Sequence, residues 1–76
     1  MMDAKKFDEN TERIKKFIDT ANRHHEYAKK WTARAEFWMG RADFDRAQKC
    51  FDRAKDEKIQ ANMRLRMARI LLNRME

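Results

Sequence analysis

Apolar residues recur every three or four positions along most of this chain, which places them on one face of an α-helix. From Phe7 to Trp38 they follow a seven-residue register without interruption, and the only glycine, Gly40, comes two residues later. The two seam columns of this register hold Phe7, Ile14, Ala21, Ala28 and Ala35, and Asn10, Phe17, His24, Trp31 and Trp38. The pattern predicts a first helix over about residues 4–39.

A second run with the same register follows Gly40 and continues to the end of the chain, which predicts a second helix over about residues 44–75. Its expected seam residues are Phe44, Ala47, Phe51, Ala54, Lys58, Ala61, Leu65, Ala68, Leu72 and Met75. Between the two helices we expect a turn over residues 40–43. In this turn Gly40 would end the first helix in a left-handed conformation, and Asp43 would cap the second.

Folding the chain back at this turn brings the two seams together in layers. Trp38 would then face Phe44 to form an aromatic tip, and alanine would face alanine further along. His24 would face Lys58 as a polar layer that sets the register. The sequence therefore predicts an all-α fold, a long antiparallel helical hairpin in a single domain, residues 1–76. An alternative stays open at residues 19–25, where indifferent helix formers would allow the first helix to break.

The second helix carries more apolar surface than its own hairpin can cover. Ile59, Met63, Met67 and Ile70 recur at helical spacing on the face away from the seam. A helix that is apolar on two faces needs a second cover, so either the N-terminal segment folds over this face or another chain does. We expect two hairpins to close into a dimeric four-helix bundle. Phe37 projects off the seam beside the turn and is a further candidate partner contact.

Residues 28–61 have the spacing of a helical pair found in a known family of repeats. Trp31, Ala35 and Trp38 stand at the Trp, Gly and Tyr positions of its first helix, and Ala47 and Phe51 at the Ala and Phe of its second. The segment thus resembles one tetratricopeptide repeat, although Arg34 and Ile59 stand where that repeat has Leu and Pro. The resemblance implies a protein-binding module without catalysis.

Composition limits the class of protein further. With no proline, one glycine and 42% charged residues, the chain is suited to long helices. Its single cysteine, Cys50, cannot form an internal disulfide, and the N-terminal residues lack the apolar run of a signal peptide. No stretch approaches membrane-spanning length. We expect a cytoplasmic protein of a bacterial cell or an infected host.

The chain offers few groups for chemistry. His24, His25 and Cys50 are its only soft metal ligands, and adjacent histidines on a helix point about 100° apart, which does not suit a shared ion. Neither a glycine-rich phosphate loop nor a plausible pair of catalytic acids is present. We therefore expect no enzyme activity, no metal and no cofactor.

Positive charge is concentrated near the C-terminus. The formal net charge is +6, and Arg64, Arg66, Arg69 and Arg74 have no acid four residues upstream. Arginine is well suited to phosphate or carboxylate groups, so these four are candidate contacts to an acidic partner or to phosphate. The favoured hypothesis is a protein-interaction module, a helical adaptor or inhibitor of the kind encoded by phages or mobile elements. The alternative is a helical dimer that binds RNA or DNA through its basic C-terminal helix.

Overall fold

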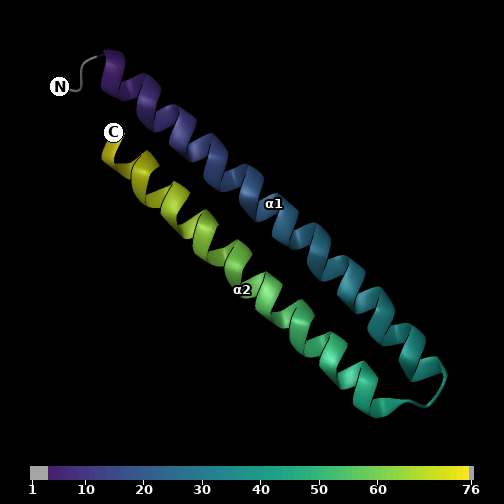
Figure 1. Cartoon of the computed structure of the whole chain (residues 1–76). Coiled ribbons are helices and arrows are strands. Elements are labelled where there is room, and N and C mark those ends of the chain that lie inside the picture. Colours follow the sequence, from purple (N-terminus) through teal and green to yellow (C-terminus); the bar gives the residue numbers. More distant parts are fainter. Residues whose placement is uncertain (1–3, 76) are drawn as a thin grey trace.

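The protein consists of two long antiparallel helices (Figure 1). The structure is a computed structural model that describes residues 4–75, except for the side chains of residues 4, 5 and 7. Helix α1 spans Ala4–Gly40 and helix α2 spans Phe44–Met75. The first turn of α1 and the last turn of α2 therefore lie at the same end of the hairpin, opposite the turn that joins the helices (Figure 1). Both helix ranges and the all-α hairpin agree with the sequence-based prediction. Because α1 is continuous through residues 19–25, the alternative of a broken first helix is wrong.

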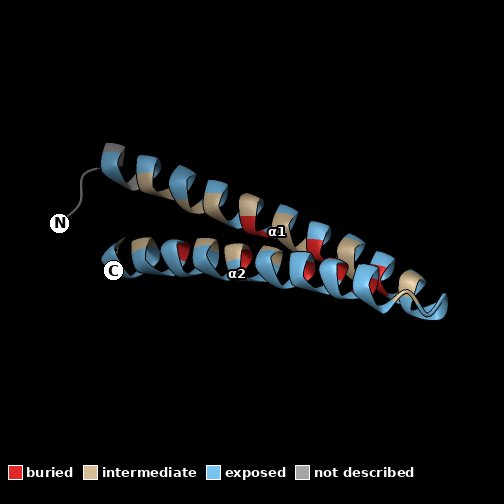
Figure 2. Ribbon diagram, turned by 60° about the horizontal axis from the view of Figure 1, so that its bottom comes forward, coloured by how far each residue is buried: buried red, intermediate tan, exposed pale blue. Residues whose placement is uncertain are grey.

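The seam of α1 is the predicted one, and it is lined with alanine. Ala21, Ala28 and Ala35 are buried, while Phe17, Trp31 and Trp38 are half-buried beside them. Figure 2 shows the buried residues on the facing sides of the two helices. The predicted layer of Phe7 with Met75 includes a side chain outside the described set. The first helix therefore packs through the face that its sequence pattern indicates.

In α2 the alanine column of the seam is as predicted, but the second column is shifted by one residue. The buried alanines are Ala47, Ala54, Ala61 and Ala68. Between Ala47 and Ala54, the residue that enters the seam is Cys50, which is 8% exposed, whereas Phe51 is 39% exposed. The same shift places Glu57, Arg64 and Leu71 against α1, whereas Lys58, Leu65 and Leu72 are exposed. The predicted pairing of Trp38 with Phe44 and the predicted place of Phe51 in the seam are therefore wrong.

Close approach of the helices explains this shift. All eight buried residues are small, seven alanines and Cys50, and among the described residues no large side chain is fully buried. Alanine columns on both helices bring the backbones together, and a phenylalanine between two of them would hold the helices apart. Cys50 fits the narrow space, so Phe51 is turned outwards.

The resulting molecule is thin and has a large surface. Its Cα trace measures 59 × 13 × 12 Å, and its radius of gyration is 17.3 Å, compared with about 11 Å for a compact domain of this length. Its accessible surface is 6424 Å², whereas a compact monomer of 9.3 kDa exposes about 5,000 Å². The hairpin therefore leaves more than a thousand Å² of additional surface in contact with solvent.

The turn is formed by a left-handed residue, but that residue is Ala42 and not Gly40. Ala42 has a φ of 59°, and Gly40 has no positive φ. The amide of Asp43 donates to the carbonyl of Trp38 over 2.9 Å, and the amide of Ala42 donates to the carbonyl of Met39 over 3.0 Å. These two bonds define a Schellman motif with Ala42 at its left-handed position. As predicted, Asp43 then caps α2, because its Oδ1 accepts from the amide of Arg46 over 3.1 Å.

Candidate protein-interaction surfaces

One side of the hairpin carries exposed apolar residues towards both of its ends. On each helix, one row of residues at seven-residue spacing, which includes the residue four positions after each seam alanine, flanks the seam. In an antiparallel pair the two rows of α1 and α2 lie side by side. His25 and Lys58, which belong to the two rows, indeed line one groove. The exposed large apolar residues of these rows are Ile18, Met39, Phe44, Phe51, Leu65 and Leu72, which we call the apolar side.

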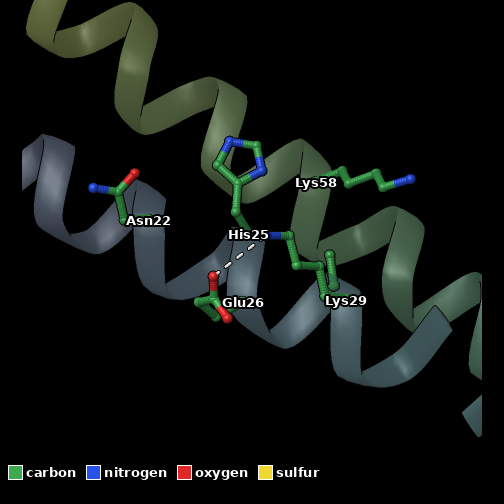
Figure 3. A pocket seen from close by; sticks show the side chains of 6 residues that line it. Asn22, His25, Glu26, Lys29 and Lys58 are labelled. Carbon is green, nitrogen blue, oxygen red and sulfur yellow. Dashed lines mark ion pairs between the residues drawn. The ribbon is translucent and has the colours of Figure 1, made fainter. Parts of the chain in front are cut away.

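A polar interruption lies halfway along the apolar side. Figure 3 shows the groove at this level, lined by Asn22, His25 and Lys29 of α1 and by Lys58 of α2. The Nζ of Lys29 lies 3.5 Å from a carboxylate oxygen of Glu26. Lys58, predicted to face His24 within the seam, therefore lies on this outer surface, and its place beside His24 is taken by Glu57.

The opposite side of the hairpin differs between its two ends. Near the turn, the half-buried indoles of Trp31 and Trp38 are covered by arginines. The guanidinium carbons of Arg34 and Arg53 lie 5.0 and 5.5 Å from the ring centre of Trp31, and that of Arg46 lies 4.6 Å from Trp38. These cation–π contacts occupy the faces of both indoles. Near the turn, this side therefore presents arginines stacked on indoles.

Away from the turn, the same side has an open groove lined in part by cations. Its apolar floor is formed by Phe17, Met67 and Leu71, with Thr20 beside them. Its lining also includes four cations, Arg13 and Lys16 from α1, and Arg74 and the half-buried Arg64 from α2. No acidic residue lines this part of the described chain. We call this feature the basic groove.

The sequence-predicted contact residues are exposed, but they do not form one site. Met67 lies in the basic groove, and Ile59, Met63 and Ile70 are exposed on α2 nearby, with no part of α1 folded over them. Of the four C-terminal arginines, Arg64 and Arg74 line the groove, while Arg66 and Arg69 lie outside it. Phe37 is exposed beside the turn, edge-on to Trp38 at 5.1 Å and under the guanidinium of Arg41.

Several residues of these surfaces were not recognised from the sequence. Arg13 and Lys16 of the basic groove belong to the first helix and were not singled out, and Phe17 was expected only as a seam residue. Of the six members of the apolar side, four had been placed in the seam, and Ile18 and Met39 had not been singled out. The signal that locates them is the register of α2 relative to α1, because it decides which rows flank the seam.

The candidate metal ligands do not form a cluster in the part of the chain that the structure describes. No three His, Cys, Asp or Glu side chains of that part come together where a metal ion could be held. Cys50 is buried in the seam, and His24 contacts Glu57. Neither helix is both long enough and apolar enough to cross a membrane over the part described.

Comparisons with known proteins do not assign this chain to a family. No protein-family model matches the chain, and neither the curated proteins nor the solved structures include a significant match to it.

Proposed function

We propose that this chain is a small non-catalytic protein-interaction module, an adaptor or inhibitor that assembles with a second copy of itself through the apolar side. The observation that carries the proposal is the apolar side itself, with six large side chains exposed along both helices. Exposed large apolar residues that gather on one side of a protein are typical of protein–protein interaction sites. A role in the cytoplasm of a bacterial cell or an infected host fits a chain with one cysteine.

The size of the uncovered surface favours a second copy as the occupant. The chain exposes roughly 1,400 Å² more than a compact monomer of its mass. A homodimer in which each chain covers this amount buries about 2,800 Å² in total, which is within the range of obligate dimers. Four helices would then surround a core containing Phe51 and Leu65, as in an antiparallel bundle.

Assembly through the apolar side leaves other surfaces available for a partner protein. The basic groove lies on the opposite side of the seam, and Ile59, Met63 and Ile70 lie on the outer face of α2. Exposed methionines suit an adaptable contact because their side chains are flexible and polarisable. The resemblance of residues 28–61 to a tetratricopeptide repeat supports the same class of function.

Binding of RNA or DNA is the competing proposal. It was based on four arginines of α2 acting together. Only Arg64 and Arg74 line the basic groove, whereas Arg66 and Arg69 lie outside it. The indoles of Trp31 and Trp38, which would be needed for base stacking, already have arginines over their rings. The protein-interaction proposal is therefore preferred.

Light scattering coupled to size-exclusion chromatography tests the assembly. We expect twice the 9.3 kDa chain mass. The double variant Phe51→Glu/Leu65→Glu should give the mass of one chain, because charges would then lie in the interface. Ile59→Glu/Met63→Glu is the matched control, with the same exchange of apolar for acidic residues on another face of α2, and it should remain dimeric. A wild-type monomer, or loss of the dimer only in the control, would contradict the proposal.

A further inference from the structure

We propose that the basic groove binds an amphipathic helix with acidic flanks, supplied by a partner protein. This inference rests on the proposed function, because it names the class of partner that the interaction module recognises. It does not depend on the apolar side, which lies across the seam from the groove.

The groove combines the two features that such a helix requires. Phe17, Met67 and Leu71 give an apolar floor that can accept apolar residues spaced at i, i+3, i+4 and i+7. Four cations line it, two from each helix. Acidic residues flanking the apolar stripe of a partner helix would lie against these cations on both sides.

The cations of the groove are available for a partner. No ion pair within the described chain involves Arg13, Lys16 or Arg74, and Arg64 donates from Nη1 to the side-chain oxygen of Gln60 over 3.2 Å. Near the turn, by comparison, Arg46 lies 3.4 Å from a carboxylate oxygen of Asp43. Among the described residues, the cations of the basic groove thus have no carboxylate partner.

The dimensions of the groove indicate how much of a partner it can hold. From Arg64 to Arg74, α2 rises about 15 Å, at 1.5 Å per residue. This length matches about ten residues, or three turns, of a partner helix. Towards the turn, Trp31 and its arginines do not line the groove, so the partner helix would end before reaching Trp31.

The apolar floor distinguishes this partner from nucleic acid. A phosphate backbone would use the four cations but would leave Phe17, Met67 and Leu71 in water. A helix with leucines on one face covers them and also uses the charges. Met67 at the centre of the floor can adapt to side chains of different shape.

The test uses a designed probe and the full-length protein. The probe is a labelled helical peptide of about fourteen residues, with leucines at i, i+3, i+4 and i+7 and glutamates at the flanking positions. We expect saturable binding by fluorescence anisotropy. Arg13→Glu/Arg74→Glu should weaken it at least about tenfold, because both helices then repel the glutamates. Met67→Glu should weaken it to a similar extent through the floor.

Arg66→Glu/Arg69→Glu is the matched control. It makes the same change in net charge, with both exchanges on α2 and outside the groove, and it should change the affinity by no more than about twofold. Absence of peptide binding, or equal weakening by both double variants, would overturn the inference. Tighter binding of a duplex of about twenty base pairs, lost in Arg13→Glu/Arg74→Glu, would replace it with a nucleic-acid site.

The outcome can be separated from that of the proposed function by measuring the mass of each sample. A wild-type dimer that does not bind the peptide would overturn only the groove inference. A monomer that binds the peptide, with the expected effects of the variants, would overturn only the assembly.

Discussion

His24 of α1 and Glu57 of α2 meet across the seam, where the Nδ1 of the histidine contacts Oε2 of the carboxylate. The two side chains are 22% and 26% exposed, so they lie between the dry alanine layers and solvent. They occur in a seam whose neighbouring layers, Ala21 with Ala61 and Ala28 with Ala54, carry no polar side-chain atoms. Because alanine layers are alike, they do not by themselves fix the sliding position of the helices. A polar pair can do so, since any shift would separate its members.

The pairing can be measured by a double-mutant cycle. We expect a coupling free energy of about 1 kcal/mol between His24→Ala and Glu57→Ala, the usual scale for a partly buried polar contact. The neighbouring cycle of His24→Ala with Lys58→Ala should give a value near zero. Urea unfolding followed by circular dichroism, at one fixed protein concentration, provides the four stabilities of each cycle. Greater coupling to Lys58 would restore the register that was predicted from the sequence.

The closeness of the two helices gives a second prediction. Ala61 has no exposed surface and lies opposite Ala21, so a larger side chain has no space. We expect Ala61→Leu to reduce the free energy of unfolding by about 2 kcal/mol through overpacking. Ala33→Leu, at an exposed position of α1, adds the same atoms without this clash and should have little effect. If Ala61→Leu were as stable as wild type, the close alanine packing would be incorrect.

The helices, their ends and the alanine columns were accessible from the sequence because each depends on a local pattern. Ala47, Ala54, Ala61 and Ala68 repeat every seven residues, and Asp43 is a strong cap. The choice between Cys50 and Phe51 was not local. Hydrophobicity alone favours the phenylalanine, whereas the space between two alanine-lined helices admits only the smaller residue.

That single choice also explains what could be predicted of the candidate site. The exposure of Ile59 and Met63 was correctly predicted, since it depends only on their distance from the alanine column. The basic groove was missed, because it joins Arg13 to Arg74, which are 61 positions apart in the sequence. Residues so far apart are brought together only by the register of the two helices. The predicted register placed the second column of the α2 seam one residue away from its position in the structure.

The turn between the helices gives a prediction about stability. Ala42 adopts a left-handed conformation, which costs a residue with a Cβ roughly 1 kcal/mol. Gly40 lies in α1 without positive φ, and a Cβ there would meet no atom within 4 Å. Exchanging the two residues should therefore relieve strain at position 42 and improve helix propensity at position 40.

We expect Ala42→Gly and Gly40→Ala each to raise the free energy of unfolding by about 0.5–1 kcal/mol. The double variant should show roughly the sum if the two effects are independent. Ala33→Gly serves as the opposite control, because glycine inside an exposed part of α1 should lower stability by a similar amount. Thermal unfolding monitored by circular dichroism is sufficient to compare them. A loss of stability in Ala42→Gly would show that residue 42 is not left-handed.

Cys50 allows the packing of the second helix to be probed chemically. Its side chain lies in the seam beside the alanine column, so a thiol reagent reaches it fully only when the helices separate. Reaction with an aromatic disulfide reagent should therefore be at least about tenfold slower for Cys50 than for an exposed thiol.

Lys49→Cys in a Cys50→Ser background supplies that exposed thiol one position away, outside both the seam and the apolar side. In urea the two proteins should react at the same rate, because both thiols are then in the unfolded chain. Equal rates without urea would mean that residue 50 faces solvent, and the seam would then have to contain Phe51 after all.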